Sequence, residues 1–462
     1  MTILLNREKP EQLSESLRGA LRLAPAEGGA QAISAALDHQ HPADIAQALR
    51  SLALSEALAV FSWLPTPQAA EVLDELDSGL TRYLIENLPP ARIAALLDRL
   101  PPDDAAEVVS EASPKSSDRL LVDIDTHAPV EAEAIRDLLS YAEGTAGRIM
   151  STRFAAFPPE ATSDEVIGSF RIHAAQLDAV SNVYAVDPAG VLLGVASVRD
   201  VLAAPAGVRL AEFMTRAIAA VIPVTPQAEV ARLIARYDLS ALPVLDDWGR
   251  ILGVVTVDDA IDVLMEELND DYFAMVGSDA DEMERRSPAQ IARLRIPWLF
   301  GTMAIELLAG VVIARFDEVL TRVILLASFM PVISAISGNV GLQAAAIVVR
   351  GLDTGHVSLS RWGRQVMREL SSAFLMAIAC GATLGVVGAV WSGHLLFGVI
   401  IGCALMASML TAGIMGTLIP MVSKKLGFDP ATTAGPFETA FQDVVGFAVF
   451  LWLASLVEPW LT

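Results

Sequence analysis

The carboxylate of Asp443 is a candidate ion-binding group, because it falls inside a long apolar stretch. Asp443 is about a dozen residues into Ala431–Val457, an apolar stretch of membrane-spanning length. A carboxylate at mid-membrane costs about 2.5–3.5 kcal/mol on insertion scales, and the apolar stretches contain no Lys or Arg to pair with it. Such a group stays ionised only where water or a cation reaches it. Because no His or Cys cluster accompanies Asp443, a hard cation with oxygen ligands, such as Mg²⁺, is favoured.

Further polar groups of the apolar part include the amides of Asn339 and Gln343 and two acids. Asn339 and Gln343 are four residues apart, so a helix carries both on one face. They either line a pore or form an interhelical hydrogen bond. Glu306 and Glu438 also fall within apolar stretches, and in a coupled transporter either of them would serve as a proton site.

A dense acidic segment, residues 256–271, contains seven carboxylates and no basic residue. On a helix, the acids at 259, 262, 266 and 270 share one stripe, where they repel one another unless cations bridge them. We expect internal Mg²⁺ to bind between this segment and N-terminal acids such as Asp98, Asp103 and Asp104; the alternative is a solvated acidic face. The seven acids are Asp258, Asp259, Asp262, Glu266, Glu267, Asp270 and Asp271.

Composition divides the chain into two parts. Of 462 residues, 53% are hydrophobic and only 19% are charged, which excludes a fully cytosolic enzyme. Residues 1–295 hold 24 Lys and Arg against 46 Asp and Glu, whereas residues 296–462 hold 8 against 9. The first part is therefore soluble and acidic, which excludes nucleic acid as a partner, and the second is apolar and nearly neutral.

The apolar part predicts five membrane-spanning helices, because about 20 apolar residues span a bilayer. Basic residues gather before span one and after spans two and four, which places these loops in the cytoplasm. The chain is then a multi-pass protein of the cell (inner) membrane, with a cytoplasmic N-terminus that lacks a secretory signal and a C-terminus outside. The spans are Ile296–Ala314, Val323–Val349, the two halves of Leu370–Ser423 on either side of residues 392–394, and Ala431–Val457.

A twelve-residue repeat occupies the N-terminal part. Leucine recurs at positions 52, 64, 76, 88 and 100, often followed by proline and then by an apolar helical pattern. Proline suits the first turn of a helix, so each copy predicts one short helix. Stacked short helices share a core between neighbours. Residues 1–130 are therefore predicted to form an all-α superhelical N domain.

A second repeat has an offset of 59 residues. Each copy predicts a strand, a turn with Asp and Gly, a second strand and a helix. This pattern resembles a tandem pair of CBS domains, and the resemblance implies that Ser197, Asp200, Thr256 and Asp259 hold the ribose of an adenine nucleotide such as ATP. The alternative is helix capping, because Ser or Thr with an acid three residues later also forms a capping box.

Several motifs together resemble the MgtE family of magnesium channels over essentially the whole length. They are residues 141–150 (YAEGTAGRIM), 294–299 (LRIPWL), 330–331 (MP), 338–343 (GNVGLQ), 429–431 (DPA) and 434–446 (AGPFETAFQDVVG). The resemblance implies a homodimer whose pore carboxylate is Asp443, with Thr439 one turn earlier. If its amide lines the pore, Asn339 is a further candidate cation ligand. The chain departs from the usual family pattern at Glu438 and Ala440, which flank Thr439.

The implied architecture is multidomain. It comprises the helical N domain (1–130), the α/β tandem CBS pair (131–268), a connecting plug helix (269–295) and a transmembrane α bundle of five helices (296–462). Because no phosphate-binding loop occurs, transport is downhill or coupled. A divalent ion gains about 4.6 kcal/mol per 100 mV on entry, so an ungated pore would overload the cell. We therefore expect a Mg²⁺-selective uptake channel that cytosolic Mg²⁺ closes.

Other functions remain as alternatives. The first is a proton-coupled or less selective divalent-cation transporter that carries Co²⁺ or Mn²⁺. The second is a membrane-tethered nucleotide sensor without transport, in which the CBS pair is the active part. An enzyme is not expected, because the sequence lacks a His-Glu-x-x-His motif and a catalytic pairing within the spans.

Overall fold

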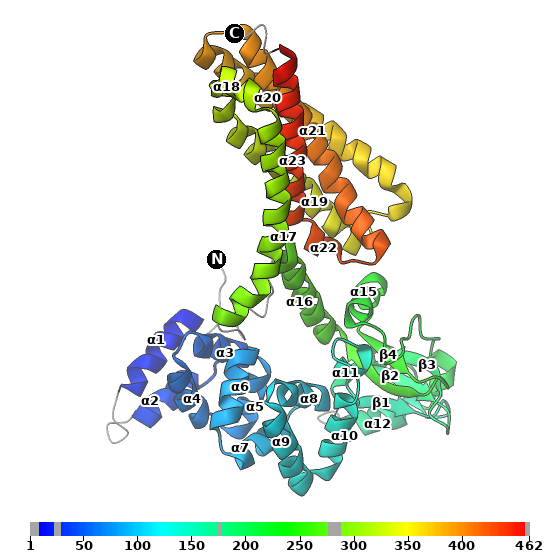
Figure 1. Cartoon of the computed structure of the whole chain (residues 1–462). Coiled ribbons are helices and arrows are strands. Elements are labelled where there is room, and N and C mark those ends of the chain that lie inside the picture. Colours follow the sequence, from blue (N-terminus) through cyan, green and yellow to red (C-terminus); the bar gives the residue numbers. More distant parts are fainter. Residues whose placement is uncertain (1–8, 23–28, 174–176, 276–287, 458–462) are drawn as a thin grey trace. The chain divides into compact units, whose positions relative to one another are not determined.

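The computed structural model describes residues 9–22, 29–173, 177–275 and 288–457. The chain divides into two compact units, Met1–Glu267 and Leu268–Thr462. Figure 1 labels the helices and strands of both. Helix α16 (Val257–Met275) begins in the first unit and ends in the second.

The N-terminal part of the first unit is the predicted superhelix of short helices. Its helices stack in two rows, in which α3 contacts α5 and α5 contacts α7, while α4 contacts α6 and α6 contacts α8. The leucines of the repeat lie at the helix junctions, where Leu64 and Leu100 are buried. The helices are α1 (Pro10–Leu21), α2 (Gly29–Leu37), α3 (Pro42–Arg50), α4 (Leu54–Trp63), α5 (Thr66–Asp74), α6 (Ser78–Asn87), α7 (Pro90–Leu97), α8 (Pro102–Glu111), α9 (Pro114–His127) and α10 (Pro129–Leu139).

Two α/β modules follow, and both have the order that the second repeat predicts. Strand β2 (Ala179–Val186) pairs antiparallel with β3 (Leu192–Ser197), and β4 (Ala241–Leu245) pairs antiparallel with β5 (Ile251–Thr256). Both connecting turns contain a glycine at positive φ, +85° at Gly190 and +81° at Gly249, which explains the recurring glycine. Strand β1 (Phe154–Phe157) adds to β2 in parallel. The remaining helices are α11 (Ala146–Ile149), α12 (Ser163–His173), α13 (Val198–Ala203), α14 (Leu210–Phe213) and α15 (Gln227–Tyr237).

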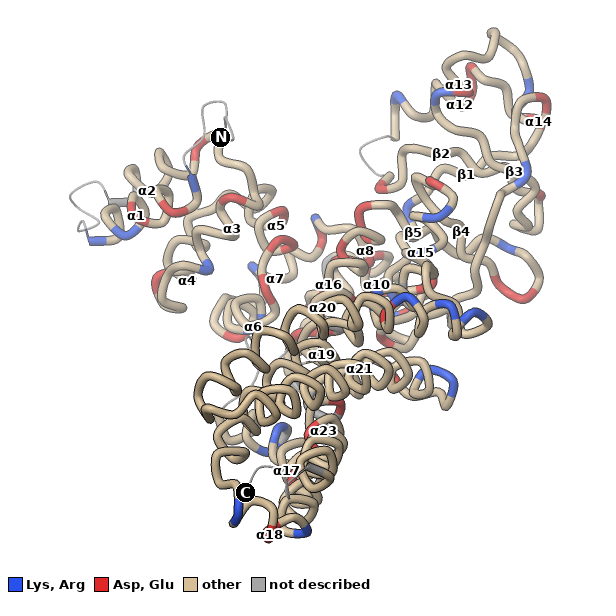
Figure 2. The backbone as a smooth tube through the Cα atoms, turned by 90° about the horizontal axis from the view of Figure 1, so that it is seen from above, with Lys and Arg blue, Asp and Glu red and all other residues tan. Residues whose placement is uncertain are grey.

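Among its described residues, the second unit contains the five predicted spans, as five helices long and apolar enough to cross a membrane. In Figure 1, α17 and α23 lie side by side, and they are in contact. Figure 2 shows most of the length of α19, α20 and α21 without Lys, Arg, Asp or Glu. The elements are α17 (Pro288–Arg315), α18 (Asp317–Arg322), a 3₁₀ turn (Ile324–Ser328), α19 (Met330–Asp353), a second 3₁₀ turn (Leu359–Arg361), α20 (Trp362–Ser392), α21 (Leu395–Leu426), α22 (Pro430–Thr433) and α23 (Pro436–Val457).

The predicted plug segment belongs to two different helices where the structure describes it. Residues 269–275 continue α16, so the acidic segment from Val257 onwards lies on one helix. Residues 288–295 form the first turns of α17. Residues 276–287 lie outside the described residues, as does the C-terminal segment 458–462.

Candidate cation sites

Asp443 lies where three membrane-spanning helices meet. It is part-buried on α23, and its Oδ1 accepts a hydrogen bond from the Ser334 hydroxyl of α19. Glu306 of α17 is a neighbouring acid that interacts with Asp443. Two carboxyl groups and one hydroxyl therefore converge from separate helices, a set of hard oxygen ligands. Sequence reasoning did not assign Ser334 to this site, because serine is common in membrane helices and its 109-residue separation from Asp443 gives no signal.

Thr439 lies one turn before Asp443, on the side of α23 that faces α19. A Cβ added to Gly338 would lie 3.6 Å from Thr439 Cγ2, so glycine lets the two helices approach here. The Thr439 hydroxyl donates to the Gly435 carbonyl oxygen at 3.4 Å. Asn339, the next residue after Gly338, is exposed in the single chain.

Gln343 is exposed on α19, and it borders a cavity instead of the Asp443 site. This cavity of about 210 Å³ also involves Arg368 and Glu369 of α20. Although Asn339 and Gln343 share one face of α19, their amides therefore do not lie beside the same site.

Glu438 is a buried acid at the junction of α19, α21 and α23. Its side chain is 0% exposed, and within the described residues neither carboxyl oxygen has a hydrogen-bond partner. A Cβ on Gly341 would overlap Glu438 Oε1, so α19 accommodates this acid only because residue 341 is glycine. One turn further along α23, Gln442 donates to the backbone oxygen and the hydroxyl of Ser408 on α21, both at 3.1 Å.

The C-terminal end of α16 packs against the start of α23 within the second unit. Ala274 and Met275 pack against a small buried cluster that includes Ala345 of α19 and Ala434. A Cβ on Gly435 would overlap the Met275 carbonyl oxygen. The helix that carries the acidic segment therefore ends in direct contact with the residues that precede Thr439 and Asp443.

A second oxygen cluster lies in the first unit. Carboxyl oxygens of Asp103, Asp104 and Asp259 all lie within 4.8 Å of one another. Asp103 and Asp104 are in the first turn of α8, and Asp259 is in the first turn of α16. Asp103 Oδ1 is buried and has no hydrogen-bond partner among the described residues. The N domain and the second CBS module therefore contribute to one candidate metal site.

The acids of this cluster and the neighbouring Asp74 and Glu107 are held close together, and Arg148 is a nearby counter-charge for Glu107. Burial is the largest cause in each case, and neighbouring carboxylates add to it. Together they raise the pKa of Asp104 to about 10, that of Asp74 to about 7, and that of Asp103 well above its usual range. Burial also raises the pKa of Glu107 and of Asp259. A divalent cation would favour the ionised forms of all these groups.

The remaining predicted acids lie outside this three-residue cluster. Asp98 is exposed at the C-terminal cap of α7. Asp258, Asp262 and Asp270 are exposed on α16, and Glu267 is part-buried. Glu266 accepts a hydrogen bond from Gln227 at 3.0 Å. The side chain of Asp271 lies outside the described residues. Sequence reasoning missed Asp74 and Glu107, although the spacing of 103 and 107 on one helix face could have indicated Glu107.

The predicted nucleotide-binding pairs make local capping hydrogen bonds. Asp200 Oδ2 accepts from the Ser197 hydroxyl at 2.6 Å and from the Ser197 backbone N–H at 3.1 Å. Asp259 accepts in the same way from the Thr256 hydroxyl and, at 3.2 Å, from its backbone N–H. Both pairs therefore start helices, which matches the capping alternative.

Comparison with protein families gives matches over three segments. Residues 330–453 match the model described as a divalent cation transporter, MgtE. Residues 40–144 match the MgtE intracellular N domain, and residues 210–266 match the CBS domain. The magnesium transporter MgtE of Thermus thermophilus is 33% identical over 455 residues, which are 97% of this chain and 99% of that protein. The chain belongs to the MgtE family of magnesium transporters.

Further relatives agree with this assignment. The magnesium transporter MgtE of Bacillus subtilis is 26% identical over 91% of this chain and 92% of its own length. Among solved structures, the cytosolic domain of the Mg²⁺ channel MgtE in complex with ATP is similar, with 34% identity and a TM-score of 0.51. That match covers 54% of this chain and 99% of the solved one. MgtE relatives are transporters, not enzymes, and the N domain, CBS pair and five apolar helices fit this family.

Proposed function

We propose that this transporter is a Mg²⁺-selective channel whose ion pathway passes Asp443. The observation that carries the proposal is the convergence of Asp443, Glu306 and Ser334 from three apolar helices. Mg²⁺ sheds its water reluctantly, so a few oxygen ligands per chain suit a hydrated ion. Two copies related by symmetry would double these ligands, and the pathway would lie in a homodimer in the cell (inner) membrane, with the N-terminus cytoplasmic and the C-terminus outside.

The pore proposal is tested by flux into vesicles that contain the purified full-length protein. We expect Asp443→Asn to abolish Mg²⁺ uptake, because the amide keeps the shape but removes the charge. Glu369→Gln is the matched control, since Glu369 is another acid in an apolar helix, α20, and lies outside this site. Equal uptake by wild type and Asp443→Asn would refute the proposed pathway. Competition by Co²⁺ or Mn²⁺ measures selectivity in the same assay.

We further propose that cytosolic Mg²⁺ closes the channel by binding at the Asp103, Asp104 and Asp259 cluster. Two observations support this. The cluster joins α8 of the N domain to the start of α16, and the end of α16 packs against residues preceding the pore helix α23. Mg²⁺ bound at one end of α16 would hold this helix in the closed arrangement, and its loss would let carboxylate repulsion separate α8 from α16.

The gating proposal is tested by raising Mg²⁺ on the cytoplasmic face. We expect inhibition of flux to require a higher Mg²⁺ concentration in Asp103→Asn/Asp104→Asn than in wild type, with uptake at low internal Mg²⁺ retained. Asp98→Asn is the matched control, because Asp98 is an exposed acid of the same domain outside the cluster. Unchanged inhibition in the double variant would refute the site.

A nucleotide such as ATP is proposed as a second regulator at the CBS pair, because a similar cytosolic domain was solved with ATP. Ser197, Asp200, Thr256 and Asp259 are the proposed ribose contacts. Binding would require Asp200 and Asp259 to exchange capping hydrogen bonds for contacts with ribose. Calorimetric titration of ATP into wild type and Asp200→Asn tests this, and equal affinities would exclude a role for Asp200.

Proton coupling remains the second candidate function, and the burial of Glu438 without a partner favours it. An ionised carboxylate in such a place is costly, so Glu438 is expected to bind a proton. Asp443 is the charged neighbour that interacts with it, and Glu306 of α17 interacts with Asp443. Gly341, which packs against Glu438, carries no charge. Uptake that depends on pH in wild type but not in Glu438→Gln would support coupling, whereas identical pH profiles would exclude Glu438.

A further inference from the structure

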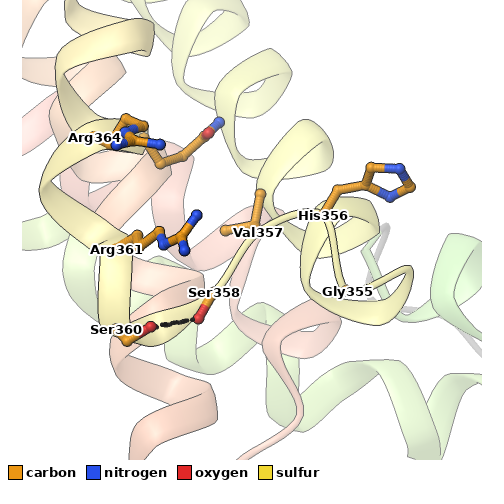
Figure 3. Close-up of a pocket in the computed structure, with 8 residues that line it drawn as sticks. Gly355, His356, Val357, Ser358, Ser360, Arg361 and Arg364 are labelled. Atoms are coloured by element: carbon orange, nitrogen blue, oxygen red, sulfur yellow. Dashed lines mark hydrogen bonds between the residues drawn. The ribbon is translucent and has the colours of Figure 1, made fainter.

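The loop between α19 and α20 forms a basic pocket at one end of the bundle. A cavity of about 360 Å³ is lined by residues that include Ser358, Ser360, Arg361 and Arg364. In Figure 3 the Arg361 side chain extends from the helix towards Val357 and Ser358, and Ser358 is hydrogen-bonded to Ser360. A second cavity of about 460 Å³ shares three lining residues with the first and adds Arg350 and Arg368. We call these two cavities the arginine pocket.

The described residues that line the arginine pocket concentrate positive charge. None of the described residues that line either cavity is Asp or Glu. Among the described residues, the four arginines form no ion pair with a carboxylate within 4.0 Å, although Arg368 interacts at longer range with its neighbour Glu369. Guanidinium groups bind phosphate with paired hydrogen bonds. The Ser358 and Ser360 hydroxyls can donate to the same anion.

Apolar side chains beside the arginine pocket indicate the kind of molecule that carries the anion. Ile347 lines the second cavity and is 53% exposed. Trp362 and Met367 line neither cavity but are next in sequence to Arg361 and Arg368 at the start of α20, and they are 56% and 60% exposed. Tryptophan at the end of a membrane-spanning helix is typical of the headgroup region of a bilayer. A free phosphate would leave this apolar surface uncovered, whereas a phospholipid would cover it.

We propose that the arginine pocket binds the headgroup phosphate of an anionic phospholipid. The arginines hold the phosphate, and an acyl chain lies along Ile347. Basic pockets between membrane helices on the cytoplasmic side recognise such headgroups through the same charges. Because α19 also carries Ser334 and Gly338, a lipid bound at its C-terminal end would tie this helix to α20.

The test uses the full-length protein in nanodiscs of phosphatidylcholine, with phosphatidylglycerol added in steps. We expect thermal stability to rise with phosphatidylglycerol, and native mass spectrometry to detect the retained lipid. In Arg361→Gln/Arg364→Gln the apparent affinity should fall about fivefold per arginine, and so about 25-fold for the pair. Arg361→Lys/Arg364→Lys, which keeps both charges, should retain more of the affinity than the glutamine pair.

Two controls separate this proposal from simpler explanations. Arg315→Gln/Lys425→Gln removes two charges near helix ends outside either cavity, and it should bind phosphatidylglycerol as wild type does. Inorganic phosphate alone should not stabilise the protein. Equal lipid affinity in wild type and Arg361→Gln/Arg364→Gln, or full stabilisation by inorganic phosphate, would overturn the proposal.

Discussion

At the scale of single residues, glycines decide which polar groups the membrane helices accommodate. Gly341 provides the space that the buried Glu438 side chain occupies, and Gly338 lets α19 approach Thr439. Adding a methyl group costs more at Gly341 than at Gly338, because only a methyl group at position 341 would overlap a neighbouring side chain. The chain therefore offers a matched pair of substitutions on one helix.

We predict that Gly341→Ala destabilises the protein by about 1–3 kcal/mol, the usual cost of overfilling a packed interior. Gly338→Ala should have a smaller effect, because its Cβ would meet Thr439 Cγ2 at an ordinary 3.6 Å. Adding Glu438→Ala to Gly341→Ala should restore part of the lost stability. Thermal unfolding of the purified variants in detergent measures all three, and equal destabilisation by the two glycine substitutions would contradict the packing described here.

At the scale of helices, α20 and α21 pack through glycines on both sides. A Cβ on Gly398 of α21 would overlap the carbonyl oxygen of Gly385 on α20, and one on Gly402 would lie 2.7 Å from the carbonyl oxygen of Gly381. Backbones approach this closely only where side chains are absent, as is typical of membrane helix pairs. Positions 381, 385, 398 and 402 therefore fix the contact between these two helices.

We predict that Gly398→Ala separates α20 from α21 and lowers the melting temperature. Gly310→Ala on α17 is the control, because a Cβ there meets nothing within 4 Å and alanine favours a helix. That variant should be neutral or slightly stabilised. Thermal unfolding monitored by size-exclusion chromatography compares them, and a Gly398→Ala protein as stable as wild type would rule out the close contact.

At the scale of the whole chain, the buried acids Asp74 and Asp104 make the free energy of unfolding depend on pH. An acid whose pKa is raised in the folded state contributes its full stability below its unfolded pKa and loses that contribution as pH rises through the folded value. For Asp74 the change runs from 3.8 to about 7, and for Asp104 from 3.8 to about 10. The acidic superhelix and CBS pair should therefore be least stable in alkaline solution without divalent cations.

We predict that, in chelator, the melting temperature of the soluble part falls as pH rises from about 5 to about 9. Saturating Mg²⁺ should reduce this slope, because it replaces the protons that the cluster releases. Asp103→Asn/Asp104→Asn should remove most of the Mg²⁺ effect, and Asp98→Asn should leave it unchanged. Calorimetry on the full chain provides the measurement. A slope that Mg²⁺ does not alter in wild type would argue against cation binding at the cluster.

Mg²⁺ should also slow limited proteolysis of the full-length protein if it closes the proposed gate. We expect slower digestion in millimolar Mg²⁺ for wild type and for Asp98→Asn, but not for Asp103→Asn/Asp104→Asn. Ca²⁺ at the same concentration tests whether the effect is selective. Equal digestion with and without Mg²⁺ in wild type would remove the support for gating.

Much of the architecture could be predicted from the sequence because it depends on local periodicity. The twelve-residue leucine repeat indicated the superhelix, the 59-residue repeat indicated two strand–turn–strand–helix modules, and the uncharged runs indicated five spans. Each signal is a repeat of residue types whose spacing matches one kind of element. Asp443 could also be singled out from the sequence, because an acid in an apolar stretch without Lys or Arg needs another partner.

Only the tertiary structure decided what these acids touch. The hydrogen bond from Ser334 to Asp443, the approach of Glu306 and the burial of Glu438 against Gly341 all join residues far apart in the sequence. The same holds for Asp103, Asp104 and Asp259, which lie on helices separated by more than 140 residues. The sequence by itself determined the elements and their chemistry, because periodicity is local; helix packing determined the partners, because contacts between distant segments leave no periodic trace.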